Sequence, residues 1–233
     1  MVLAIAIAAI AGWFLLPTAA GVIVADRLTA AGFRGTGTRV MVEADPPLAL
    51  AALHADRVHV TSTDAQFQGL VIGALDVTLS DVNLLDRTAS AVAGTLTELR
   101  LESGTGTSWS VSSAEISGSS ADARITLRLS AADARLMAAG AVEGKLGSRP
   151  TSLTLTAPDR IQFVVRGTAV GGRLVADDEG RLVFQPGGAA SSLVGPILLL
   201  TPGPDVPLRA TSVRVAPDGI VLVAAIDASL ILH

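Results

Sequence analysis

The side chains best suited to bind a metal ion are those of His54, Asp56 and His59, which lie close together in the sequence. Imidazole and carboxylate groups are common zinc ligands when they converge on one point. In a β-strand, however, His54 and Asp56 would share one face and His59 would point to the other. The spacing therefore favours polar residues at a strand surface or edge, and no metal or other cofactor is expected.

A run of carboxylates at residues 177–179 is the next candidate, because such groups bind calcium or act as acids and bases. The run lacks the ligand spacing of an EF-hand loop. Two similar segments flank it, Arg-Leu-Val-Ala at 173–176 and Arg-Leu-Val-Phe at 181–184. This arrangement predicts a solvated hairpin tip rather than a calcium or catalytic site.

The common catalytic motifs are absent from the sequence. It contains no Gly-x-Ser-x-Gly, Ser-x-x-Lys, P-loop or His-Glu-x-x-His pattern. Gly104-Thr-Gly106 lacks the third glycine of a dinucleotide site and opens no helix. The chain has three histidines, and one of them is the last residue, His233, which leaves little for acid–base catalysis. A non-enzymatic protein is expected.

The composition favours contact with apolar partners. Half of the 233 residues are hydrophobic but only 3% are aromatic, so the apolar surface is almost wholly aliphatic. Few residues of the aromatic kind that anchor specific protein interfaces are present. The net charge of −4 gives no basic stripe, so nucleic acid is not an expected partner. The absence of cysteine excludes disulfides.

The N-terminal segment, residues 1–25, is predicted to be a membrane anchor or signal segment. The segment contains no charged side chain, because the first one in the chain is Asp26. Such an apolar run is long enough to cross a bilayer as a helix. Small residues at 18–20 allow a signal-peptide cleavage site, and a buried helix of a soluble protein is the alternative. Basic residues follow the segment rather than precede it, so the topology stays open. Residues 26–233 are predicted to form a single domain.

Helix signals are few in this domain. A helix at 25–35 would end by Gly32 or Gly35, and Pro46-Pro47 would open a short one. Ser130, with Asp133 three residues on, can cap a longer helix. That helix would carry Ala132, Leu136 and Ala139 on one face and would end among the glycines at 140, 144 and 147. A buried short helix is expected to begin near Pro196.

Strand signals dominate the rest of the domain. Apolar residues alternate at period 2 from residue 38 onward, with glycine-containing turns between the runs. Residues 151–165 and 211–224 are two similar hairpins, each with Ala-Pro-Asp at its turn. Together with the helix signals, these patterns predict an α+β domain with a long antiparallel, curved sheet in meander order.

The alternation slips by one residue at two similar places, Ser80-Asp81 and Thr97-Glu98. Residues 79–84 and 96–101 both read Leu, hydroxyl, acid, aliphatic, polar, Leu. A β-bulge inserts one extra residue and so returns the side chains that follow to the same face. Bulges at matching places in two neighbouring strands would curve the sheet. The alternative is that each strand ends at the pair.

The order of these pieces resembles the bacterial LmeA-like phospholipid-binding family. The segments that carry the resemblance are GALDVTLSDV, ITLRLSAADARLM, LTLTAPDRIQFVV with the hairpin after it, and the closing SVRVAPDGIVLVA. The resemblance covers nearly all of residues 20–230. Pro46-Pro47-Leu48 stands where the family often has Pro-Phe-Leu, which leaves a binding role for that segment in doubt.

The resemblance implies an extracytoplasmic protein that binds phospholipid and is attached to the membrane or secreted into the cell envelope. It also implies a fold similar to the tubular lipid-binding class, with a strongly curved antiparallel sheet wrapped against a few helices. Aliphatic residues of the slipped strands would line the concave face and others would close it. The lining residues are Leu75, Val77, Leu79, Val82, Leu84, Leu96, Leu99 and Leu101, and the closing residues are Leu136, Met137, Ile197, Leu198 and Leu200. From periodicity alone, a structural or scaffolding protein with a filled core is the alternative.

Overall fold

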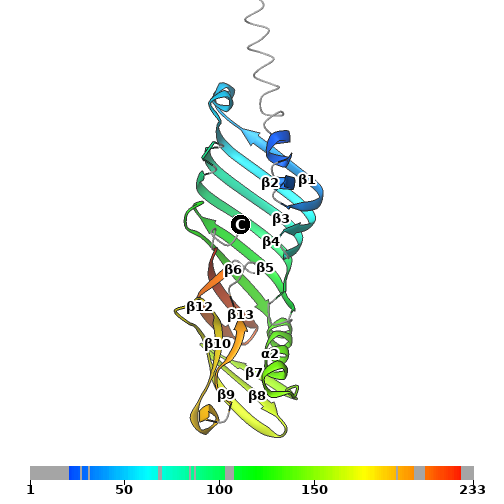
Figure 1. Cartoon of the computed structure of the whole chain (residues 1–233), viewed down its shortest axis with the longest axis vertical. Helices are drawn as coiled ribbons and strands as arrows, with labels where there is room; N and C mark the ends of the chain where they lie inside the picture. The colour runs from blue at the N-terminus through cyan, green and yellow to red at the C-terminus, as the bar shows by residue number, and fades with distance from the viewer. Residues whose placement is uncertain are drawn as a thin grey trace, which may run out of the picture. The chain divides into compact units, whose positions relative to one another are not determined.

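The structure is a computed structural model, shown in Figure 1. It describes residues 21–26, 28–30, 32–67, 70–83, 85–86, 88–102, 108–192, 194–201 and 208–226. Most of these residues lie in β-strands. Thirteen strands form two sheets, one of eight strands and one of five. The predicted class, an α+β fold of the tubular lipid-binding type with its sheet wrapped against several helices, is therefore wrong. The described fold is mainly β.

Strands follow one another along most of the described chain (Figure 1). The elements are β1 (Arg34–Glu43), η1 (Pro47–Ala52), β2 (His54–Phe67), β3 (Leu70–Asn83), β4 (Thr88–Glu102), β5 (Ser108–Gly118), β6 (Ala123–Ser130), α2 (Ala131–Leu146), β7 (Ser152–Thr156), β8 (Arg160–Val165), β9 (Thr168–Ala176), β10 (Leu182–Pro186), η2 (Gly188–Ser192), β11 (Ile197–Leu200), β12 (Leu208–Ala216) and β13 (Gly219–Ile226). The hydrogen-bonded orders are β1-β2-β3-β4-β5-β6-β13-β12 and β11-β10-β9-β8-β7. Short connections between successive strands are typical of antiparallel sheets.

The chain divides into two compact units. Unit 1 comprises Met1–Phe67, Ile72–Leu96 and Ile116–Ala123, and unit 2 comprises Gln68–Val71, Thr97–Glu115 and Arg124–His233. The sequence predicted one domain after the N-terminal segment.

An aliphatic cluster forms the core of unit 1. Its buried members are Val42, Leu50, Ala55, Val58, Val60, Val82 and Ala89. Half-buried side chains of β3 and β4, and Val24 and Leu28 of the helical residues 21–26 and 28–30, pack against it. Each buried valine or leucine side chain contributes roughly 1.5–3 kcal/mol relative to exposure. The predicted short helix after Pro46 is confirmed as η1, which contributes Leu50 to this cluster.

The strands of this core continue through the places where the alternation slips, so the predicted bulges are confirmed. Asp81 in β3 and Glu98 in β4 both have a φ of 53°, in the left-handed region. Leu96 and Leu99, three residues apart on either side of the β4 slip, are both buried, which a regular strand would not allow. The acids therefore occupy the extra-residue positions.

A third bulge precedes these two. Asp64 in β2 has a φ of 48°, and β2 carries one extra residue between Thr63 and Gln66 relative to β1. The hydroxyl–acid pairs Thr63-Asp64, Ser80-Asp81 and Thr97-Glu98 thus recur every 17 residues. The sequence pattern missed the first pair because Ser62 replaces the leucine that precedes the other two.

The bulges of β3 and β4 do not lie side by side, contrary to the expected matching places. The Ser90 hydroxyl of β4 donates a hydrogen bond to the Ser80 carbonyl oxygen beside the β3 bulge. Glu98 follows Ser90 by eight residues, or roughly 26 Å of extended strand.

Unit 2 contains both predicted hairpins. β7 pairs with β8 and β12 pairs with β13, each antiparallel across an Ala-Pro-Asp turn. The prediction of a short helix beginning near Pro196 is wrong. Residues Ile197–Leu200 form β11, which pairs with β10. A short apolar run fits a buried strand as well as a buried helix, and here the free edge of β10 decides between them.

The α-helix of unit 2 begins where the capping signal predicts. The Ser130 hydroxyl accepts a hydrogen bond from the Asp133 backbone N–H and donates one to the Asp133 carboxylate. The helix continues past Gly140 and Gly144 to Leu146, and Gly147 ends it with a φ of 64°. It packs against β7, β11 and β13.

The N-terminal membrane helix predicted at residues 1–25 is not observed. Residues 1–20 lie outside the described part of the chain. Within the part that is described, no helix combines the length and apolar character needed to cross a bilayer.

Replacement of Glu98 tests the β4 bulge. Glu98→Val should lower the free energy of unfolding by about 1–2 kcal/mol, because a left-handed φ is costly for an L-residue and most of all for a β-branched one. Glu98→Gly should be nearly neutral. Thr95→Val, at an exposed position of the same strand, is the control, and urea unfolding followed by circular dichroism measures all three. Equal effects of the two valine substitutions would contradict the bulge.

Candidate functional site

A strip of half-buried aliphatic side chains in unit 1 is the candidate binding surface. Leu75, Val77 and Leu79 follow one another on one face of β3, and the structure leaves all three partly accessible. Leu75 and Leu79 pack against the core cluster, as do Val40 and Val92. We call these five residues the aliphatic face.

Gly94 of β4 lies directly against Val77 of β3. A Cβ built on Gly94 would come within 2.8 Å of the Val77 Cα and 2.7 Å of its Cγ2. Real side chains do not approach so closely, so only glycine fits between these strands without displacing Val77. The backbones therefore meet closely at Val77, and β4 places no side chain over it at this position.

Several predicted lining residues join the aliphatic face or the core beneath it. Leu75, Leu79 and Val82 meet in the unit 1 cluster, as the bulge requires. Leu96 is buried in β4 at a 5% exposed fraction, and Leu99 of unit 2 at 1%. Leu84 and the side chain of Leu101 lie outside the described residues.

The predicted closing residues belong to unit 2. Met137 is 1% exposed and belongs to the buried face of α2 with Ala134, Ala138 and Val142. Leu136, expected beside it, is 60% exposed, so the predicted helix face of Ala132, Leu136 and Ala139 is wrong. Ile197 and Leu200 are 1% exposed on β11.

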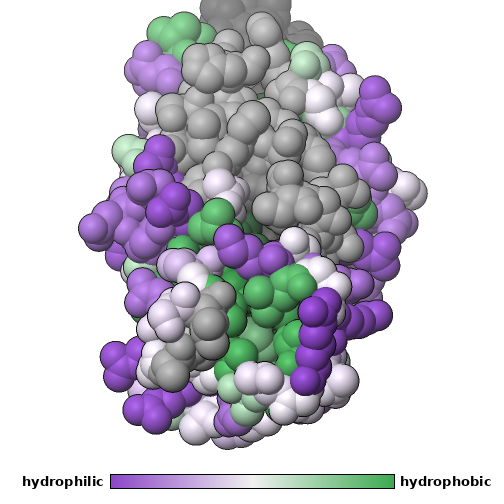
Figure 2. Space-filling view, turned by 60° about the horizontal axis from the view of Figure 1, so that its bottom comes forward, coloured by the Kyte–Doolittle hydropathy of each residue, from purple (hydrophilic) through white to green (hydrophobic). Residues whose placement is uncertain are grey.

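Unit 2 also presents apolar side chains to solvent. Leu198 on β11 is 41% exposed, and Leu136 is the other large hydrophobic residue exposed on α2 or β11 in the described part of the unit. Figure 2, which brings the lower part of the molecule forward, shows apolar surface bordered by hydrophilic side chains. Isolated exposed leucines are common on proteins, so this surface alone assigns no function.

The two histidines of the suspected metal motif make separate contacts between β2 and β3. His54 Nε2 lies 3.3 Å from Asp81 Oδ1 and 3.9 Å from Asp56 Oδ1. His59 Nε2 lies 2.8 Å from Asp76 Oδ1. No group of three His, Cys, Asp or Glu side chains arranged to hold a metal ion occurs among the described residues.

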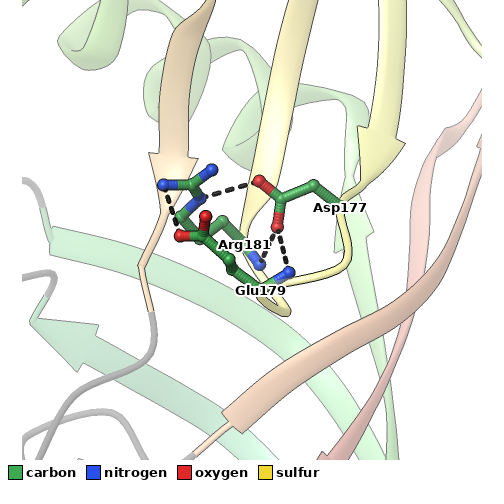
Figure 3. A network of polar contacts seen from close by, with 3 residues as sticks. All are labelled: Asp177, Glu179 and Arg181. Carbon is green, nitrogen blue, oxygen red and sulfur yellow. Dashed lines mark hydrogen bonds and ion pairs between the residues drawn. The ribbon is translucent and has the colours of Figure 1, made fainter.

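The carboxylate run forms the tip of the β9–β10 hairpin, as predicted (Figure 3). Asp177 Oδ1 accepts hydrogen bonds from the backbone N–H groups of Glu179 and Arg181, and its Oδ2 accepts one from the Arg181 guanidinium at 2.7 Å. The guanidinium also lies 2.7 Å from Glu179 Oε2. The Gly180 carbonyl accepts a hydrogen bond from the Ala210 N–H, which attaches the tip to β12.

This network shifts the titration of Asp177. Partial burial acts to raise the pKa of its carboxyl, but the backbone and guanidinium hydrogen bonds from Arg181, with the charge of that guanidinium, outweigh it and lower the pKa. The hydrogen bond to Asp177 raises the pKa of Arg181. Both carboxylate oxygens of Asp177 accept hydrogen bonds from residues of the turn itself, so the arrangement is structural.

A shallow pocket of about 300 Å³ lies between the helical residues and β1 of unit 1. Its lining residues are Ala25, Thr29, Phe33, Arg34, Gly35 and Thr38. Arg34 is the one charged residue among the described residues of this lining, and it is exposed. The pocket and the unit 1 cluster use neighbouring residues of the helical segment. Val24 and Leu28 pack against the cluster, and the residues that directly follow them, Ala25 and Thr29, line the pocket.

Sequence reasoning missed this pocket. No spacing rule links Thr29 of a helical segment with Thr38 of the next strand, and no motif marked Arg34. The usable signal was weaker: an arginine and several hydroxyl residues cluster where the helix signal ends and the strand pattern begins.

No family model, curated protein or solved structure matches the chain. The resemblance to the LmeA-like family therefore stays a prediction from the sequence.

Truncation of two neighbouring residues tests the observed face of α2. Met137→Ala should lower the free energy of unfolding by about 2–4 kcal/mol, because it removes a fully buried side chain. Leu136→Ala should change it by less than about 0.5 kcal/mol. Thermal and urea unfolding measure both, and a larger cost for Leu136→Ala would restore the face predicted from the sequence.

Replacement of Asp177 tests the hairpin network and its pH dependence. Asp177→Asn should lower the free energy of unfolding at pH 7 by roughly 1–3 kcal/mol, because charge-assisted hydrogen bonds are lost. The folded-state pKa is lowered, so this contribution is present above the unfolded value of about 3.9 and disappears as the pH falls through the folded value. Urea unfolding of both proteins at several pH values measures it. Asp178→Asn, at the exposed neighbouring position, is the control, and a stability difference that grows toward acid pH would contradict the network.

Proposed function

We propose that the chain is a non-enzymatic phospholipid-binding protein of the bacterial cell envelope, which holds acyl chains against the aliphatic face of unit 1. Phospholipid and the membrane are its proposed partners. Its role would be lipid carriage or the regulation of envelope lipids and glycolipids. The protein would be attached to the cytoplasmic membrane or secreted, and the apolar sequence of residues 2–25 motivates this location.

The observation that carries the proposal is the half-buried row Leu75, Val77 and Leu79 on β3. These side chains repeat every two residues, so the row extends roughly 13 Å along the strand. An acyl chain requires a surface that excludes water and offers no unpaired polar group. The row meets this requirement with aliphatic side chains alone.

The energetics favour acyl chains as ligands. Each methylene transferred from water to an apolar surface contributes about 0.8 kcal/mol, so ten methylenes contribute roughly 8 kcal/mol. Loss of translational and rotational freedom opposes association by about 4–15 kcal/mol. Acyl contact alone therefore gives weak binding, and stable binding requires a second contact.

A structural or scaffolding envelope protein with a filled core is the second candidate. The observation that favours it is the near-complete burial of Met137, Ile197 and Leu200, which were predicted to close a lipid groove. Side chains packed at this level occupy a core without a ligand.

Native mass spectrometry of the full chain, purified in mild detergent and then exchanged out of it, separates the two candidates. We expect phospholipid to remain bound to the wild-type protein. Val77→Asn should reduce the bound fraction roughly tenfold, because an unpaired amide buried by an acyl chain costs about 1–3 kcal/mol.

Thr78→Asn is the matched control, because Thr78 lies on the opposite face of the same strand. It should bind lipid as the wild type does, and circular dichroism should show both variants folded. Wild-type protein that retains no phospholipid and takes up none from vesicles would contradict lipid binding and favour the scaffolding function.

A further inference from the structure

We propose that the pocket around Arg34 binds the phosphate of an anionic phospholipid whose headgroup carries hydroxyl groups. This inference rests on the proposed function and supplies the second contact that acyl binding requires. The ligand chemistry is a phosphodiester with a polyhydroxyl substituent, for which phosphatidylglycerol is the probe.

Arg34 supplies the charge for this contact. Among the described residues it is the single ionisable side chain that lines the pocket, so none of them offers a carboxylate that competes with a phosphate for its guanidinium. A guanidinium binds phosphate oxygens through two parallel N–H groups, which a lysine ammonium cannot reproduce. The exposed position leaves this fork accessible.

The hydroxyl groups of the pocket favour a hydroxylated headgroup. The Thr29 hydroxyl donates its hydrogen to the Ala25 carbonyl oxygen at 3.0 Å, so its oxygen is left to accept. Thr38 Oγ1 lies 2.9 Å from the Ser62 hydroxyl and 3.2 Å from the Gly35 carbonyl oxygen. A headgroup hydroxyl can donate a hydrogen bond to the Thr29 or Thr38 hydroxyl oxygen, whereas a quaternary ammonium has no hydrogen to donate.

The size and surroundings of the pocket agree with a lipid headgroup. About 300 Å³ is at the lower end of the range for small-molecule sites. Phe33 and Ala25 give the lining an apolar part. On the same helical segment Val22 and Ile23 are 57% and 60% exposed, so this segment presents apolar side chains to its surroundings.

The test compares lipid uptake by the full-length wild type, Arg34→Gln and Arg39→Gln. Arg39 lies on the same strand, carries the same charge and is exposed, but it is not among the residues that line the pocket. The proteins are incubated with vesicles of phosphatidylcholine, with or without phosphatidylglycerol, and bound lipid is measured by native mass spectrometry. Arg34→Gln should lower phosphatidylglycerol uptake about tenfold, whereas phosphatidylcholine, whose choline group cannot donate to the hydroxyl oxygens of the pocket, should be taken up weakly by both proteins.

A second variant and a salt series keep the result interpretable. Arg34→Lys should retain part of the preference for phosphatidylglycerol, because it keeps the charge and loses the fork. High salt should weaken the wild-type preference. Circular dichroism checks that each variant is folded.

Three outcomes would overturn the inference. Equal losses for Arg34→Gln and Arg39→Gln would assign the effect to general surface charge, and an unchanged preference in Arg34→Gln would exclude the pocket. Binding of soluble glycerol phosphate, measured by calorimetry, without lipid uptake would assign the pocket to a free phosphate. Wild-type protein that binds neither lipid identifies failure of the proposed function itself, whereas wild-type uptake with an unaffected Arg34→Gln identifies failure of the pocket alone.

Discussion

Strand side chains alternate strictly between two faces, and the core of unit 1 depends on how the chain compensates for slips in that alternation. One extra residue is needed wherever the apolar pattern changes phase. Asp64, Asp81 and Glu98 occupy these positions with left-handed backbones. Without them, Val82 and Leu99 would turn to the face opposite the residues that precede them. In unit 1 this compensation lets Val82 join the same aliphatic cluster as Leu75 and Leu79, which precede the bulge on β3.

The features that could be predicted from the sequence have local causes. The bulges of β3 and β4 were visible because a hydroxyl–acid pair interrupts an alternating run, and each interruption needs only its own strand to be recognised. The Ser130 cap and the two Ala-Pro-Asp hairpins are likewise determined by a few neighbouring residues. Their chemistry acts over one turn or one hairpin, which a single sequence contains in full.

The features that could not be predicted depend on contacts between distant segments. α2 is rich in alanine and glycine, so its sequence marks no clear apolar stripe, and packing against β11 and β13 selects Met137 rather than Leu136. The run at Ile197–Leu200 is a strand because β10 offers it an edge. The mainly β fold and the Arg34 pocket were missed for the same reason. Of the residues predicted to line a lipid site, the structure brings Leu75, Leu79 and Val82 together in unit 1. All three lie on β3, so the pattern of that strand alone was enough to predict their shared face.

The 17-residue recurrence of the bulges has a consequence for how such a sheet can change length. Each 17-residue period contains one strand and the connection to the next. The bulge stands at the same position in each period and returns the apolar side chains that follow it to the face of those before it. Loss or duplication of one period would reverse the direction of every later strand. Two periods, 34 residues, would preserve both strand direction and face. A change in the width of this part of the sheet that keeps the later strands in place therefore requires the gain or loss of a whole hairpin.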